Sequence, residues 1–100
     1  MIKHVVMWKF KAKAEGADKD ANIRKLKAML EALPAKVRGM ESLEVGVDFA
    51  RSEASWDLVL VSAFQSEGAL AAYQEHPEHR KVAEFAAKVR DTRSVVDYRV

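Results

Sequence analysis

Cysteine is absent from this chain of 100 residues, which excludes disulfides, thiolate metal sites and a cysteine nucleophile. Proline and glycine are scarce, with two and four residues, and no low-complexity stretch divides the chain. No apolar run approaches the ~18 residues of a membrane span, and the first residues lack the apolar stretch of a secretory signal. These absences favour a single domain over residues 1–100, which we expect in the cytoplasm and away from membranes.

An excess of one charge is also missing, because 17 Lys and Arg residues stand against 15 Asp and Glu, for a net charge of +2. Residues 1–40 are the more basic part of the chain, as a site for a polyanion would be. Solvated lysines at a strand end and in a loop account for the same excess. Nucleic-acid-binding domains usually carry a stronger and more clustered excess, so we expect no nucleic acid partner.

Hydrophobic residues make up 49% of the chain. In some segments they recur at every second residue, as in strands, and in others three and four residues apart, as in helices. β-branched, aromatic and alternating side chains predict four strands, over residues 2–11, 42–50, 55–65 and 93–100. The apolar face of the second strand comprises Leu43, Val45, Val47 and Phe49. After a loop over residues 12–19, apolar residues three and four apart predict a helix that is capped by Asp18 or Asp20 and ends or kinks at Pro34. Pro77 splits a second helical region into segments of about 67–75 and 77–90.

These elements follow one another as β-α-β-β-α-β, which predicts the ferredoxin-like α+β fold. Two helices then cover one face of a four-stranded antiparallel sheet. The other face is apolar too, because it carries Val5, Met7, Val59, Val61 and Ala63, and such a face usually marks an interface. Stacking of nucleic acid bases would need aromatic side chains with basic neighbours there, whereas these side chains are aliphatic. We therefore predict a homodimer that pairs sheet to sheet.

Three histidines are the conventional proton carriers of the chain near neutral pH. His79 is the third residue of the helical segment that begins at Pro77, where the helix dipole disfavours a protonated ring. A neutral imidazole is what a general base requires. Val82 and Ala86 share its helix face and are apolar, so we expect His79 to point towards the sheet.

Two further side chains are expected to reach the same cavity. Tyr73 leaves the preceding helical segment on its apolar side, and the break at Pro77 brings it near His79. His4 shares a strand face with apolar residues, so it is either a hydrogen-bonded core residue or a third polar group of the site. His76 is expected to cap a helix instead. A phenol and two imidazoles in an apolar pocket can move protons and stabilise an enolate.

The sequence contains no recognisable metal or cofactor motif. His76 and His79 do not have the i, i+4 spacing with a nearby carboxylate that is typical of metal-binding pairs on helices. A Gly-rich phosphate loop, a serine elbow and paired buried carboxylates are also missing. We therefore predict no metal site and no cofactor.

Three segments carry a family resemblance: residues 2–11 (IKHVVMWKFK), residues 76–79 (HPEH) and residues 95–98 (VVDY). Together they resemble the stress-responsive A/B barrel domain, a dimeric α+β barrel family, and the resemblance spans the whole chain. It implies a ferredoxin-like protomer that pairs sheet to sheet into a barrel with the helices outside.

Most members of that family have no assigned reaction. The resemblance therefore implies first a homodimer that binds a small, partly apolar organic ligand between sheet and helices. The residues expected to line this pocket are Val6, Trp8, Val82 and Phe85. The sequence names neither the ligand nor a pathway.

One characterised branch of the family is a plant polyketide cyclase that forms olivetolic acid by an intramolecular aldol condensation, using a histidine as acid and base beside a tyrosine. If this chain is an enzyme, the resemblance implies a cofactor-independent cyclase or lyase. His79 would take the proton, Tyr73 would stabilise the oxyanion, and His4 would line the pocket. A cofactor-free monooxygenase, also known on the related barrel fold, is a further alternative.

Overall fold

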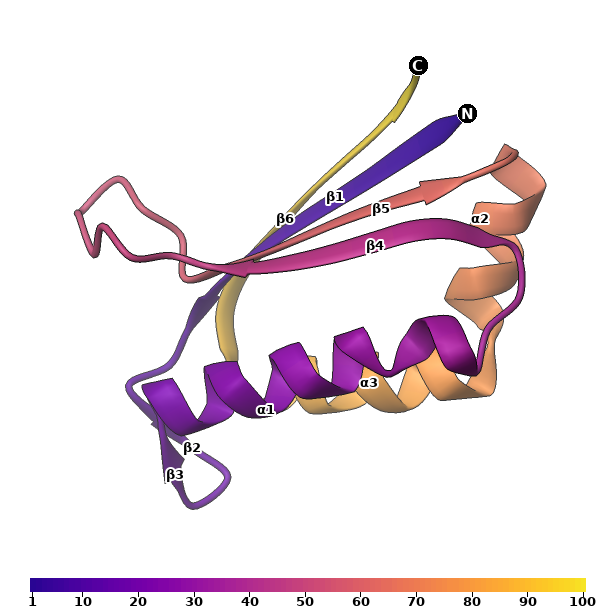
Figure 1. Ribbon diagram of the computed structural model, residues 1–100. Helices are drawn as coiled ribbons and strands as arrows, with labels where there is room; N and C mark the ends of the chain where they lie inside the picture. Colours follow the sequence, from indigo (N-terminus) through magenta and orange to yellow (C-terminus); the bar gives the residue numbers. More distant parts are fainter.

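A four-stranded antiparallel sheet and the helices packed on one of its faces make up the computed structural model, which describes residues 1–100 (Figure 1). The strands of the sheet lie in the order β4-β5-β1-β6. Their bounds are Met40–Val47, Leu58–Phe64, Ile2–Phe10 and Arg90–Arg99. The helices are α1 (Lys19–Glu31), α2 (Glu67–Glu75) and α3 (Pro77–Val89), with a 3-10 turn at Leu33–Ala35. The predicted ferredoxin-like order is confirmed.

Alternation along β1 separates the two faces of the sheet, because successive side chains of a strand point to opposite sides. Every second residue of this strand is buried against the helices: Ile2, His4, Val6, Trp8 and Phe10. The residues between them are half-buried and belong to the face that no helix covers. Figure 1 shows α1 and α3 running side by side beneath the sheet, with α2 at one end. The apolar core therefore lies between the sheet and these helices.

Each of the three helices begins after a residue whose side chain caps it. The Asp18 carboxylate accepts a hydrogen bond from the Ala21 amide at 2.8 Å at the start of α1, and Ser66 caps α2 through the Ala69 amide. His76 caps α3, and the ring of Pro77 suits the first helical position because its missing N–H has no partner there anyway. The predicted division of the second helical region is confirmed.

Three details of the prediction are wrong. Residues 12–19 are not a plain loop, since β2 (Lys13–Ala14) and β3 (Ala17–Asp18) form a small hairpin before α1. Phe49 does not join the apolar face of β4, which ends at Val47, and its side chain is 95% exposed. The last strand begins at Arg90, directly after α3, and not at residue 93.

The uncovered face of the sheet carries apolar side chains. Val5 pairs with Val61 on one side and with Val96 on the other. Val96 and Tyr98 remain 58% and 48% exposed on the edge strand. Ala63, predicted on this face, is buried.

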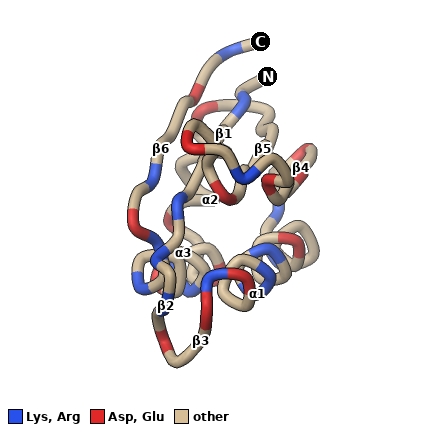
Figure 2. The backbone as a smooth tube through the Cα atoms, turned by 90° about the vertical axis from the view of Figure 1, so that its left-hand side faces the viewer, with Lys and Arg blue, Asp and Glu red and all other residues tan.

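Acidic and basic residues are interspersed along the chain. Figure 2 shows blue and red segments alternating along β6, in agreement with its sequence RDTRSVVDYR. None of the helices combines the length and hydropathy needed to cross a membrane. The two chain ends lie side by side, and the amide of Val100 donates to the carbonyl of Met1 at 3.0 Å.

Candidate functional site

A cavity of about 190 Å³ lies between the sheet and the helices. It is lined by thirteen residues, of which nine are hydrophobic. Strands β1, β5 and β6 and helices α1, α2 and α3 all contribute to its wall. The remaining four lining residues are His4, His79, Arg90 and Arg93. The site is therefore an apolar chamber with a few nitrogen-bearing side chains.

His4 is held in one orientation by the neighbouring edge strand. His4 and Asp97 face each other across the β1–β6 ladder, and His4 Nδ1 is hydrogen-bonded to a carboxylate oxygen of Asp97. A carboxylate only accepts, so Nδ1 carries the proton, and in the neutral ring Nε2 is the acceptor. The His4 carbonyl also accepts from Ser62 Oγ at 3.2 Å. His4 is only 2% exposed, so it is a hydrogen-bonded core residue, and its side chain also lines the cavity.

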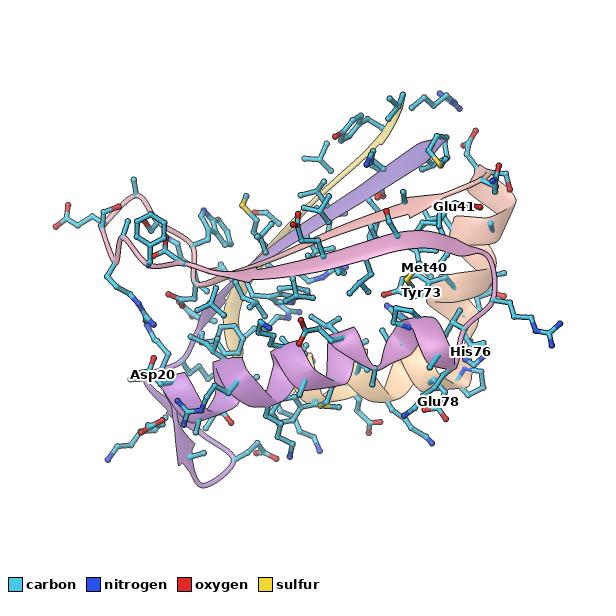
Figure 3. The ribbon with its side chains drawn as sticks, in the orientation of Figure 1. Asp20, Met40, Glu41, Tyr73, His76 and Glu78 are labelled. Atoms are coloured by element: carbon cyan, nitrogen blue, oxygen red, sulfur yellow. The ribbon has the colours of Figure 1, made fainter.

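Tyr73 reaches into the cavity from α2 (Figure 3). Its hydroxyl is buried and has no hydrogen-bond partner. Burial raises the pKa of Tyr73 to about 12, although the positive charge of Arg93 opposes this effect. The phenol therefore stays protonated at neutral pH and is free to donate to an oxygen placed in the cavity.

His79 lies directly beside Tyr73, with 4.5 Å between the ring centroids. Its Nδ1 is 3.1 Å from the carbonyl oxygen of Gln74, which can only accept, so Nδ1 carries the proton. Burial lowers the pKa of His79 below the usual 6.5. The Gln74 hydrogen bond raises the pKa of His79, whereas the charges of His4, Arg93 and His76 lower this pKa further. The ring is therefore neutral near pH 7, with Nε2 as a basic nitrogen.

The structure brings the three predicted residues together. The rings of His4 and Tyr73 are 6.3 Å apart and edge to face, so Tyr73 stands between the two imidazoles. His76 lies at the junction of α2 and α3 (Figure 3), where its Nδ1 accepts from the Glu78 amide at 3.0 Å. It does not line the cavity.

Three of the four residues predicted to line the pocket do so, namely Val6, Trp8 and Val82. Phe85 does not. Its side chain packs against the edge of the core, with the Lys25 ammonium of α1 4.5 Å from the centre of its ring. Phe85 is three residues after Val82, so its side chain is offset by about 60° around α3, on the side where Lys25 of α1 lies over its ring. The indole Nε1 of Trp8 is buried without a partner.

Sequence reasoning missed Arg90 and Arg93. Both lie on β6 and line the cavity, and neither takes part in a salt bridge. Their spacing could not have indicated them, because residues three apart on a regular strand point to opposite faces, and the start of the strand was predicted three residues too late. Nowhere in the fold do three or more potential metal-ligating side chains come together.

The profile of the stress responsive A/B barrel domain matches residues 2–100. The chain belongs to this family. This A/B barrel domain is similar to a dimeric protein of unknown function and ferredoxin-like fold from Bacteroides fragilis, with a TM-score of 0.85 and 28% sequence identity. The match covers 99% of this chain and 95% of that one.

Two more distant structures share the fold with this A/B barrel domain. One is a protein of the same family from Mesorhizobium loti, with a TM-score of 0.75, 16% identity and coverage of 99% and 95% of the two chains. The other is a hydroxynitrile lyase from Passiflora edulis, with a TM-score of 0.81, 18% identity and coverage of 99% and 92%. Comparison of the sequence with curated proteins finds no match.

Proposed function

We propose that this protein binds a small, partly apolar organic molecule in the cavity between sheet and helices. The observation that carries the proposal is the buried Tyr73 hydroxyl without a partner. Leaving such a group unpaired costs about 1–3 kcal/mol, and buried polar groups are otherwise paired in the great majority of cases. A ligand oxygen in the cavity would accept the missing hydrogen bond, while the apolar wall would cover the rest of the molecule.

The size of the cavity restricts the ligand. An apolar cavity of about 150 Å³ takes up a benzene ring, so 190 Å³ suits a single ring or a short branched chain with a small polar group. Benzylacetone is a suitable probe because it joins one ring to one carbonyl through a short chain. Butylbenzene is a matched control of similar size that lacks the oxygen.

The proposal is tested by titrating both compounds into the isotope-labelled protein and following the cavity methyl signals by NMR. We expect benzylacetone to shift the signals of Val6, Leu60 and Val82. The substitution Tyr73→Phe should weaken benzylacetone about tenfold, as expected for one hydrogen bond worth ~1.4 kcal/mol, and leave butylbenzene unchanged. If neither compound shifts these signals at millimolar concentration, the cavity is not a binding site for molecules of this class.

We also propose that the protein is a homodimer whose two sheets face each other. Val5, Val61 and Val96 form a continuous apolar row on the uncovered face, and a second copy would remove this row from water. The Bacteroides fragilis relative is described as dimeric.

Proton transfer by a cofactor-independent lyase or cyclase is the second candidate function. It is favoured by the neutral His79 ring beside the Tyr73 phenol. His79 Nε2 would accept the proton from a carbon next to a carbonyl group; the C–H electron pair would move into the enolate, whose oxygen accepts from Tyr73. The enolate carbon would then attack a second carbonyl of the same substrate, forming a C–C bond, and the new alkoxide would take a proton back.

The first half of this reaction is measurable without the natural substrate. In deuterated buffer, benzylacetone should exchange its α-protons faster in the presence of the protein than in buffer alone. His79→Ala should abolish this acceleration, whereas Arg80→Ala, which alters an exposed residue of α3 outside the cavity, should preserve it. If benzylacetone binds but its α-protons do not exchange faster, the ligand-binding function stands and the enzymatic function is contradicted.

A further inference from the structure

We infer that the ligand of this cavity is a small organic carboxylate, whose acid group is held by Arg93 and Arg90 on β6. The inference rests on the proposed function, since it names the chemical class of the molecule that occupies the same cavity. It adds an anion site on the part of the cavity wall that β6 forms.

An irregularity of the sheet places both arginines on the same face. Residues three apart on a regular strand point to opposite faces. Arg93, however, pairs with Trp8, and Arg90 pairs with Phe10, which are only two residues apart on β1. The register shifts between Lys9 and Phe10, so that Asp91 is an extra residue of β6. A β-bulge of this kind redirects a side chain, and here it turns Arg90 to the helix-covered face beside Arg93.

The two guanidinium groups have no counter-ion in the protein. No acidic side chain forms a salt bridge with either of them. Asp97, on the same face of β6, is hydrogen-bonded to His4. Arg99, further along that face, does have a partner, since it is paired with Glu67. The strand therefore carries one arginine with an acidic partner and two without one. Of these two, Arg90 is half-buried and Arg93 is exposed, and both line the cavity.

The charges around Arg93 favour an anion beside it. Burial and the neighbouring charge of Arg90 lower the pKa of Arg93 below its ordinary value. An anion between the two arginines would replace this repulsion with attraction. The negative charge of Asp97 acts in the other direction on Arg93, but the Asp97 carboxylate forms no hydrogen bond with it.

A carboxylate is the anion that best suits this arrangement. The planar guanidinium donates two parallel hydrogen bonds to a carboxylate. The cavity is small and mostly apolar, which favours an anion with an attached hydrocarbon body. Tyr73 is a separate neutral donor deeper in the chamber and can serve a second oxygen of the same molecule.

The test compares two probes of equal shape, hydrocinnamate and its uncharged amide, by calorimetric titration at neutral pH and low salt. We expect hydrocinnamate to bind at least about tenfold more tightly than the amide, because hydrogen bonds to a charged partner are the stronger ones. Arg93→Gln should remove this preference without changing the affinity for the amide, and Arg90→Gln should reduce it. Arg99→Gln, which neutralises an arginine outside this cavity, is the matched control and should preserve the preference.

The outcomes separate this inference from the proposal on which it rests. Equal binding of the two probes, or a preference that survives in Arg93→Gln, would overturn the carboxylate site while leaving the ligand cavity intact. Binding of neither probe, together with no response to benzylacetone, would overturn both.

Discussion

The ring centroids of Tyr73 and His79 lie 4.5 Å apart although the two residues belong to different helices. In one continuous helix, residues six apart would be rotated by about 240° and separated by about 9 Å along the axis. The extended backbone of His76, with φ −64° and ψ 135°, breaks the helix before Pro77 and allows the two side chains to meet. This junction therefore creates the polar part of the cavity, and most of our predictions concern it.

Tyr73→Phe should stabilise the free protein. The substitution removes a buried hydroxyl that has no partner and keeps the aromatic ring packed between Phe64 and His79. We expect the free energy of unfolding to rise by about 1 kcal/mol. Urea denaturation of both proteins measures the change. A loss of stability of similar size would show that the hydroxyl is satisfied in the folded protein, and it would remove the main support for a ligand oxygen at this position.

The His79 ring should titrate below the usual 6.5, because burial in the cavity disfavours its protonated form. NMR spectra of the histidine ring protons as a function of pH measure the midpoint, and His79→Gln assigns the signal. A midpoint at or above 6.5 would contradict the neutral base on which the enzymatic candidate depends.

The same shift should make stability depend on pH. Because the pKa of His79 is lower in the folded state, the unfolded chain binds more protons between the two pKa values. The contribution of His79 is therefore fully present above about 6.5 and is lost as the pH falls below that value towards the pKa of the folded state. Urea denaturation on both sides of this window should show a smaller loss of stability for His79→Gln than for the unaltered protein.

Asp97→Ala should destabilise the fold although its position is on an exposed edge strand. The substitution leaves the buried His4 Nδ1 without its acceptor, which costs about 1–3 kcal/mol. Asp97→Asn retains an acceptor oxygen and should cost less. Asp91→Ala alters another exposed aspartate of the same strand that has no such partner, and it serves as the control. Equal unfolding midpoints for the three variants would mean that the His4–Asp97 contact contributes little.

Val61→Lys should convert a dimer into a monomer, because it places a charge in the middle of the uncovered apolar face. Light scattering coupled to size-exclusion chromatography should give twice the chain mass of 11.2 kDa for the unaltered protein and the single mass for the variant. Ala72→Lys, on the exposed side of α2, should remain dimeric. A single mass for the unaltered protein at micromolar concentration would contradict the dimer.

Much of the fold was predictable because its signals are local. Alternation in β1 separates the two faces residue by residue, and Pro77 marks the junction of α2 and α3 without any knowledge of the tertiary structure. The meeting of Tyr73 and His79 follows from that junction and from the helix faces on which the two residues lie. His4 joins them because the covered face of β1 is directly above.

The remaining parts of the site depend on register, which local patterns do not reveal. The contact between His4 and Asp97 needs the alignment of β1 with β6, two strands at opposite ends of the chain. Arg90 was missed because the extra residue of β6 interrupts alternation at the start of the strand, where α3 ends. For Phe49 the prediction extended the strand too far. The alternation of apolar residues continues from Val47 to Phe49, although the pairing of β4 with β5 stops at Val47.

The bulge at Asp91 also divides β6 into two parts that are free to change separately. Beyond it, the pairing of Asp97 with His4 and of Val96 with Val5 fixes the register. Before it, the strand follows directly from α3 and makes no contribution to those pairs. Removing a single residue here would rotate Arg90 away from the cavity while leaving the downstream pairing in place. A length change in one short connection is therefore a route by which members of this fold can exchange a charged chamber for an apolar one without rebuilding the sheet.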